Sequence, residues 1–434
     1  MRQMLWVFLI MPTLGWSDEW RLSVADWSRL AGLETTRTMT LDAPGARDVD
    51  GRLVFERVEL RAPGAEVWAM VDGERRALPP TGQVVLSGRD PARPDWRFTL
   101  VFDSDGQLAA GAVYADRGLQ SLRAYADRDS ILLRAFDIDD LLPDGVRTDF
   151  QCANEALQSV ADYELPLAGA GARIQGAPRS DTLRVGVLTI DTDKEWLEKR
   201  FSDNVANAAA WIEQLVAVTN VLFERDVNLR MLQGETILRV GSDPYTAGGS
   251  AANRERLEEF GQYWFSNFAS TPRTHAALIS GRSSSGNSAA GIAWLNTYCR
   301  QQRVGGSYSL NQLFWNQNIG VNSSARIFAH EIGHNLGSVH THCYNPPVDQ
   351  CYNAESGCFD GTPSCPAGGS GTLMSYCNFP GPSGANCGQA RLELHPTVAS
   401  LIDSRIEANY PACIQDFVED EVVIDPLFED RFET

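Results

Sequence analysis

Four side chains that can bind a metal or transfer a proton lie close together in the segment HEIGHNLGSVH, at residues 330–340. His330 and His334 are four positions apart, so on a helix they face the same side, about one turn from each other. Two imidazoles in that arrangement can bind one zinc ion. Glu331 projects at an angle to the two histidines, where it can reach a metal-bound water without binding the metal itself. The spacing therefore predicts a zinc site with an acid–base residue beside it.

The residues that follow this pair can complete a set of three ligands. Gly337 can adopt a positive φ at little cost, which lets the chain turn back sharply, and His340 follows three residues later. Three histidines would leave the fourth zinc position open for water. His342 lies beyond the expected spacing and remains a less favoured alternative for the third ligand. His275, in a strand-like segment, and His395, before a proline, are expected to be structural.

A helix must carry the first three of these residues, and other elements must position it. We expect this helix in the segment SARIFAHEIGHNLG, with Asn322 and Ser323 as its N-terminal cap and Gly337 at its end. Hydrophobic periodicity predicts strands at residues 183–191, 227–232, 275–280 and 291–299, and amphipathic helices at residues 205–222 and 257–268. This alternation predicts an α/β (α+β) domain with a mixed sheet over residues 181–413.

The chain before this domain has a different pattern. Residues 18 to about 175 contain short apolar-alternating runs separated by Gly, Pro and Asp turns, which predict a mostly β domain. Residues 168–181, AGAGARIQGAPRSD, show no periodicity and are interpreted as a linker or processing site. At the other end, residues 414–434 carry eight acidic groups against one arginine, so we expect an acidic tail outside the core.

The first residues and the overall charge indicate where the protein acts. Residues 1–17 combine one early arginine, an apolar stretch and small residues at Gly15 and Ser17, as a cleaved secretory signal does. No other stretch approaches about 18 uninterrupted apolar residues, so no stable membrane insertion is expected. The formal net charge of −19 leaves no broad phosphate-neutralising surface, which argues against nucleic acid as a partner. The prediction is a secreted protein, extracellular or, in a bacterium, periplasmic.

The placement of the nine cysteines supports export. Eight of them lie between residues 299 and 413, whereas Cys152 stands alone far upstream. Their spacing lacks the C-x-x-C hairpins of a structural zinc site, so we expect disulfides formed in an oxidising compartment. Eight cysteines allow 105 pairings, and the sequence does not choose among them.

The motifs resemble a known family. HEIGHNLGSVH matches the H-E-x-x-H-x-x-G-x-x-H signature of metzincin zinc endopeptidases, and GTLMSYC, residues 371–377, resembles the Met-turn that follows it. By that resemblance Met374 would lie beneath the three zinc-bound histidines. The segment GIAWLNTYC and the cysteine-rich stretch look most like the reprolysin or adamalysin branch, over residues 183–413. In one departure, Thr341 follows the third histidine, where that branch often has aspartate.

The resemblance and the residues agree on the expected activity, which is hydrolysis of peptide bonds in protein or peptide substrates. Zinc would polarise the peptide carbonyl and activate water, while Glu331 would take the water proton and pass it to the leaving amine. An extended substrate would pair with the strand at residues 291–296, unless that strand is simply buried. Tyr376 lies at the position where other metzincin branches have a tyrosine near the zinc; a packing tyrosine remains the alternative.

Two further hypotheses follow. An exported binding or adhesion protein on an inactive peptidase scaffold is the competing function, and the presence of Glu331 argues against it. Residues 18–180 are expected to be a propeptide that keeps the enzyme latent, with the thiol of Cys152 occupying the open zinc position. A small buried thiol, or a disulfide between the two blocks, remains the alternative for Cys152.

Overall fold

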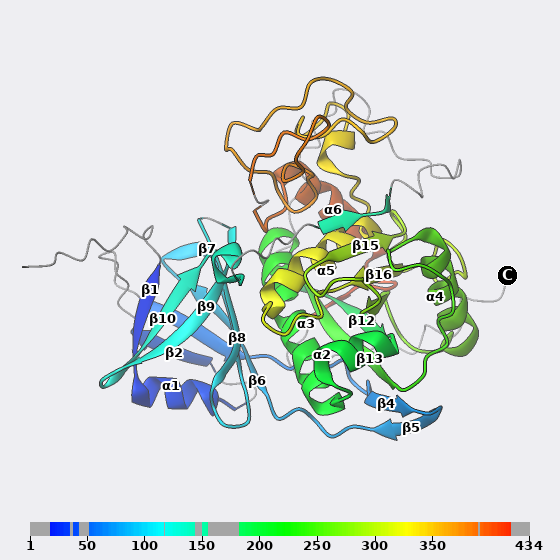
Figure 1. Cartoon of the computed structure of the whole chain (residues 1–434). Helices are drawn as coiled ribbons and strands as arrows, with labels where there is room; N and C mark the ends of the chain where they lie inside the picture. Colours follow the sequence, from blue (N-terminus) through cyan, green and yellow to red (C-terminus); the bar gives the residue numbers. More distant parts are fainter. Residues whose placement is uncertain are drawn as a thin grey trace, which may run out of the picture.

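The computed structural model describes residues 18–34, 38–42, 52–116, 118–143, 150–154, 182–388 and 391–417. The predicted signal peptide, residues 1–17, and the predicted linker, residues 168–181, lie outside the described residues. Two sheets dominate the molecule (Figure 1).

The first sheet contains eight antiparallel strands from the N-terminal block, which we define as the described residues 18–154. Its order is β1 (Glu19–Ser23), β10 (Ser130–Phe136), β9 (Gly118–Asp127), β8 (Leu108–Ala115), β7 (Arg93–Phe102), β6 (Val84–Asp90), β3 (Arg52–Arg57) and β2 (Thr38–Asp42). Helix α1 (Val24–Ala31) packs on this sheet, and a short 3₁₀ helix, η1 (Ile138–Leu141), follows β10. Alternate residues of these strands form an apolar core that includes Trp20, Phe55 and Phe98. The block is mostly β, as its alternating runs indicated.

The second sheet is mixed and contains nine strands. Its order is β11 (Phe150–Cys152), β15 (Ala289–Ala293), β16 (Tyr308–Gln312), β14 (His275–Ser280), β12 (Arg184–Thr192), β13 (Leu229–Val240), β4 (Val67–Val71) and β5 (Glu74–Ala77), with β17 (Gln415–Asp416) paired to the start of β12. Strand β15 runs antiparallel to β16, whereas β16, β14, β12 and β13 are parallel to one another. The predicted mixed α/β architecture is confirmed.

Helices cover both faces of this second sheet. Along β14, Ala277 and Ile279 join the core cluster that contains α3 (Val205–Val227), α5 (Val321–Asn335) and α6 (Pro396–Asn409), together with α2 (Lys194–Phe201). The alternate residues Ala276 and Leu278 join the cluster around α4 (Arg254–Asn267). Because successive side chains of a strand point to opposite faces, the two clusters lie on opposite sides of the sheet. A 3₁₀ helix, η3 (Thr341–Cys343), follows α5.

Helix α3 is the one helix in the described part of the chain that is long and apolar enough to cross a membrane. Two thirds of its most apolar window is buried inside the protein, and it packs against α5 and β13. Its apolar surface is therefore used in the core.

The N-terminal block contributes strands to both edges of the second sheet, which the sequence did not indicate. Strands β4 and β5 extend it beyond β13, and β11 pairs in parallel with β15 at the opposite edge. The sheets therefore do not divide at residue 180. The C-terminal boundary also needs correction, because Ile414 is fully buried in the core and Gln415–Asp416 form β17. The described residues end at residue 417, so the predicted tail begins no earlier than residue 418.

Candidate active site

Helix α5 carries the first three predicted residues, and a turn after it brings the fourth. The helix ends at Asn335, and Gly337 has φ of 106°, a left-handed conformation that allows the reversal predicted for it. The ring centroids of His330, His334 and His340 lie 4.7 to 5.4 Å apart. All three side chains are buried.

The N-terminus of α5 differs from the sequence-based expectation. The capping position is Gly320, without a side-chain cap, so the prediction that Asn322 and Ser323 cap the helix is wrong. Both residues lie in its first turn. The Asn322 amide donates instead to the carbonyl oxygen of Gly111 (3.0 Å) and the hydroxyl of Ser121 (2.7 Å), in β8 and β9. A long-range contact to the N-terminal block has replaced the local one.

Each of the three imidazoles has its Nδ1 bonded to an acceptor on the side away from the cluster. These bonds run from His330 to the Leu373 carbonyl (2.8 Å), from His334 to the Ser338 carbonyl (2.7 Å) and from His340 to the Glu355 carboxylate (2.7 Å). Because these acceptors carry no proton, Nδ1 must be the protonated nitrogen of each neutral ring. The Nε2 lone pairs therefore face the centre of the cluster.

The inward nitrogens fit a metal ion. Nε2 of His330 and Nε2 of His334 lie 3.0 Å apart, and Nε2 of His340 is buried without a hydrogen-bond partner. Burial, followed by the neighbouring imidazoles, lowers the pKa of His330 to about 3 and that of His334 well below its usual value. Neutral rings at this distance have no proton to share. A bound cation would satisfy all three lone pairs, and together with the thiol of Cys152 they form a group of possible ligands within 4.8 Å of one another.

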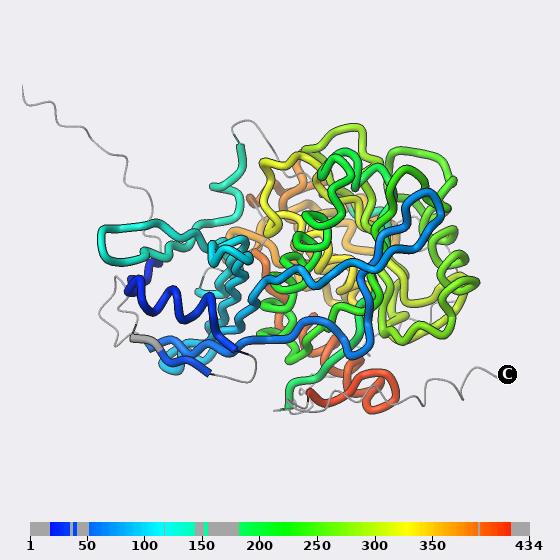
Figure 2. The backbone as a smooth tube through the Cα atoms, turned by 90° about the horizontal axis from the view of Figure 1, so that it is seen from below, coloured from blue at the N-terminus to red at the C-terminus, as the bar shows by residue number. Residues whose placement is uncertain are grey.

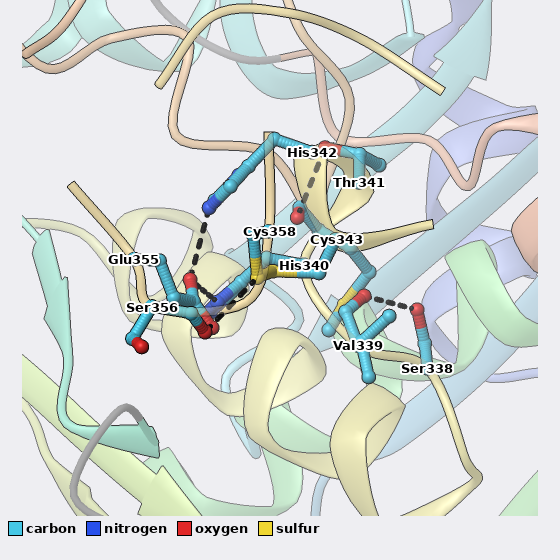
Figure 3. Close-up of a disulfide and its surroundings, with 10 residues drawn as sticks. Ser338, Val339, His340, Thr341, His342, Cys343, Glu355, Ser356 and Cys358 are labelled. Carbon is cyan, nitrogen blue, oxygen red and sulfur yellow. Dashed lines mark hydrogen bonds and ion pairs between the residues drawn. A yellow bond between two sulfur atoms is a disulfide. The ribbon is translucent and has the colours of Figure 1, made fainter. Parts of the chain in front are cut away.

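Glu355 is a residue that sequence reasoning missed. Its Oε2 accepts hydrogen bonds from His340 Nδ1 and from His342 Nε2 (2.9 Å), and the Cys343–Cys358 disulfide lies beside it (Figure 3). Burial raises the pKa of this carboxyl, but the two imidazoles have the larger combined effect and lower it below its usual value. A carboxylate that orients a ligand histidine is a common outer partner in metal sites. No spacing in the sequence marks it, since the disulfide-bonded loop places it.

The other histidines are placed as follows. His342 donates to Glu355 and stacks on His340, with ring centroids 5.6 Å apart. The group of possible metal ligands that contains His330 and His334 includes His340 and not His342. His275 is buried and contacts Ser307 Oγ (3.1 Å) and Ser309 Oγ (2.9 Å), outside the site.

Glu331 is buried beside the histidines. Its Oε1 has no hydrogen-bond partner, and its Oε2 accepts from the thiol of Cys152 at 3.8 Å. Burial raises the pKa of this carboxyl well above its usual value. Gly291 in β15 allows the close approach, because a Cβ at this position would lie 2.1 Å from Glu331 Oε1.

Cys152 lies in the site although it precedes His334 by 182 residues along the chain. Its Sγ is 3.4 Å from Nε2 of His334. Strand β11 holds it there, with Cys152 opposite Gly291 and the Ala153 amide donating to the Gly291 carbonyl (2.8 Å). The Cys152 carbonyl oxygen accepts a hydrogen bond from the Tyr376 hydroxyl (2.9 Å).

Met374 and Tyr376 lie close to the three histidines. Met374 is fully buried, and a Cβ on Gly333, between the first two histidines, would lie 2.6 Å from its sulfur. The ring of Tyr376 packs 4.2 Å from that of His340, centroid to centroid. Thr341, where the family branch often has aspartate, donates from its amide (3.0 Å) and its hydroxyl (3.3 Å) to the Met374 carbonyl. The threonine thereby ties the segment after the third histidine to the Met-turn.

The prediction that eight cysteines pair with one another is confirmed. The disulfides are Cys299–Cys413, Cys343–Cys358, Cys351–Cys377 and Cys365–Cys387, and Cys152 is a free, buried thiol. Three of the four bonds lie between residues 343 and 387, in the segment coloured yellow to orange that lies above α5 in Figure 1.

Comparison with known proteins agrees with this geometry. Residues 181–384 match the family model Reprolysin_5, metallo-peptidase family M12. This segment is therefore a reprolysin-like metzincin peptidase, and the protein is a zinc metalloendopeptidase. Among solved structures, metalloproteinase-II from Bacteroides fragilis is similar at a TM-score of 0.38 and 12% identity, over 88% of this chain and 96% of that one. That likeness is too low to carry an argument. No curated protein matches the chain.

Proposed function

We propose that this protein is a secreted endopeptidase in which His330, His334 and His340 bind the zinc ion and Glu331 transfers the proton. The observation that carries the proposal is the convergence of three buried Nε2 atoms, each fixed by an outer acceptor at Nδ1. When bound, zinc would supply Lewis-acid polarisation and a water of lowered pKa. His342 keeps a supporting place through Glu355.

Glu331 has the position that proton transfer needs. Its Oε1 is buried beside the histidine cluster without a partner, so this oxygen is available to take up a proton and to pass it to a leaving nitrogen. The raised pKa that burial gives this carboxyl makes such proton uptake easier.

The substrate would occupy the place of β11 along β15. A peptide at this edge can use the same backbone groups, since the Gly291 carbonyl already accepts from the Ala153 amide. The Tyr376 hydroxyl would then donate to a substrate carbonyl, as it does to the Cys152 carbonyl (2.9 Å). Its packing on His340 is part of the same arrangement.

In the full chain the N-terminal block would act as a propeptide, with Cys152 blocking the site. Two observations support this: β11 covers the edge of β15, and the Cys152 thiol lies 3.4 Å from His334 Nε2. Because the other eight cysteines pair among themselves, this thiol is available for zinc. Secretion behind a signal peptide, residues 1–17, is supported by the four disulfides.

Replacement of Glu331 by Gln tests the proposed function. Processed Glu331→Gln protein should retain about one zinc per chain while its cleavage of a casein or peptide-library substrate falls by a factor on the order of 10²–10⁴. His395→Gln is the matched control, because His395 caps α6 by accepting from the Thr397 amide (3.2 Å) and lies outside the histidine cluster. Zinc-free wild-type protein, or full activity in the Gln variant, would contradict the proposal and favour a binding protein on a peptidase scaffold.

A further inference from the structure

Residues 58–78, which we call the edge segment, leave the first sheet and run along the outer edge of β13. The Gln233 amide donates to the Leu60 carbonyl (2.6 Å), and the Ala62 amide donates to the Gln233 carbonyl (2.9 Å). Further along, β4 pairs with β13 over five residues and β5 folds back on β4. We call the described residues from 182 onward the catalytic part of the chain. Figure 2 shows the edge segment, in blue, passing across it.

Trp68 anchors the edge segment. It is 4% exposed and lies in the apolar cluster on the α4 side of the sheet, whose other buried members in the described residues all come from residues 237–310. Its indole N–H donates to the Glu235 carboxylate. Arg75 from β5 covers the ring at 3.8 Å and also bonds Glu235 (2.9 Å). A tryptophan of the N-terminal block thus completes a core that belongs to the catalytic part.

The edge segment packs outside the apolar cluster that α1 forms with the first sheet, and its Val58, Leu60 and Val67 lie instead in the large cluster that also contains α3. The apolar cluster of the first sheet is formed by residues 20–55 and 86–135 and contains no residue of the edge segment. In contrast, Ala62 packs with Val185 and Leu232 in a small cluster at the same edge. The edge segment therefore contributes mainly to contact between the two parts of the chain. Without it, β13 would present an unpaired edge beside apolar side chains, which favours renewed strand pairing.

We propose that the outer edge of β13, together with the site of Trp68, is a docking surface for the chain's own edge segment. Through it the N-terminal block stays bound after the connection between residues 154 and 182 is cut. This inference rests on the proposed function, in which the block is a propeptide. It adds that a single cut does not free the active site, because β11 and Cys152 are retained with the bound block. Activation requires the fragment to dissociate or to be degraded.

The test uses the full chain with a site for a sequence-specific protease inserted between residues 154 and 182. After cutting, the two fragments should co-elute in gel filtration at micromolar concentration, and peptidase activity should remain latent. Activity should appear on dilution, as the fragments separate. Fragments that separate at once at micromolar concentration would overturn the proposal.

Variants of the edge segment sharpen this experiment. Trp68→Ala should weaken the association of the cut fragments by about 30-fold or more, as the loss of a buried anchor residue does. Trp68→Phe keeps an aromatic ring but loses the indole N–H, so its effect should be smaller; it also serves if the Ala variant misfolds. Arg76→Ala is the control, because Arg76 lies exposed in β5 and pairs only with Glu74 (3.4 Å) in the described structure. Equal dissociation constants for Trp68→Ala and Arg76→Ala would refute the docking surface.

The same preparation separates failure of this inference from failure of the proposed function. Co-elution reports the association of the two fragments and is measured without substrate, and its loss in Trp68→Ala but not in Arg76→Ala assigns that association to the docking surface. If the isolated catalytic fragment binds zinc but hydrolyses no peptide, the proposed function is wrong, while co-elution would still support the docking surface.

Discussion

The two edges of the second sheet are both covered by strands of the N-terminal block, yet the two contacts differ in kind. At the edge next to the histidines, β11 pairs with β15 over three residues, and Cys152 and its carbonyl contact groups of the site. At the far edge, β4 pairs with β13 over five residues, brings β5 with it and buries Trp68. The three-residue contact of β11 could be replaced by a substrate strand, whereas the longer contact of β4, with its buried tryptophan, would be harder to separate. In the proposed zymogen, strand addition would serve inhibition at one edge and attachment at the other.

Two glycines, one at each edge, should give opposite effects when changed to alanine. At Gly291 the new Cβ would meet the flexible carboxyl end of Glu331 at 2.1 Å, so the carboxyl would move aside at little cost in stability. Loss of its position should lower kcat/KM of the processed enzyme by a factor on the order of 10²–10⁴. At Gly234 in β13 the Cβ would meet the stiff Val187 side chain at 2.7 Å, which should cost about 1–3 kcal/mol of unfolding free energy. Peptide hydrolysis and urea unfolding measure the two outcomes. Equal losses of activity and of stability in the two variants would contradict the proposed difference between the edges.

Removal of the thiol at the near edge should release latency without any cut. We expect unprocessed Cys152→Ser to hydrolyse a fluorogenic peptide on the order of 100-fold faster than the unprocessed wild type, a difference equivalent to about 2.7 kcal/mol. Unprocessed Trp68→Ala should stay latent, because its change lies at the far edge and leaves β11 in place. Equal latency in the wild type and in Cys152→Ser would show that the thiol has no part in blocking the site.

One carboxylate, Glu355, lies beside the histidine cluster and another, Glu235, lies beside Trp68, and only the first should affect the metal. Glu355→Gln should weaken zinc binding by about 10–100-fold, because it removes the charge that orients His340. Glu235→Gln, beside Trp68, should leave zinc affinity unchanged. Competition with a chromophoric chelator measures both affinities.

The pH dependence of stability gives a second readout for Glu355. The pKa of Glu355 in the folded protein lies below its usual value of 4.5, so its ionised form stabilises the fold above about pH 4.5. This contribution is lost as the pH falls toward the lower, folded-state pKa. The stability advantage of metal-free wild type over Glu355→Gln should therefore shrink below about pH 4.5 in urea titrations. A constant difference across that range would contradict the assigned role.

Most of what the sequence predicted is local, with Cys152 as the exception that the cysteine count indicated, whereas the parts that it missed are long-range. His330, Glu331, His334 and His340 follow from the helix repeat and one glycine turn, so their spacing sufficed. Glu355 reaches the site only because a disulfide folds its loop back, and Trp68 meets Glu235 across 167 residues. The cap prediction failed for the same reason, since Asn322 bonds to Gly111 rather than to its own helix. A hairpin that adds to a distant sheet has the same alternation of apolar and polar residues as a hairpin that stays in the sheet of its own domain, so the alternation alone does not tell the two apart.

The smallest effect is expected at the C-terminus, where β17 is a third and shorter strand addition. Deletion of residues 418–434 should change the unfolding free energy by less than about 0.5 kcal/mol and leave peptide hydrolysis unchanged. Deletion of residues 414–434 should cost about 2–5 kcal/mol, because it also removes fully buried Ile414. That deletion also removes Asp416, which pairs with the buried Arg184 at the start of β12. Urea unfolding of the two deletions compares them directly. If the shorter deletion destabilised the protein as much as the longer one, the acidic residues beyond 417 would have a structural role, and strand addition at β12 would not account for the stability of this end.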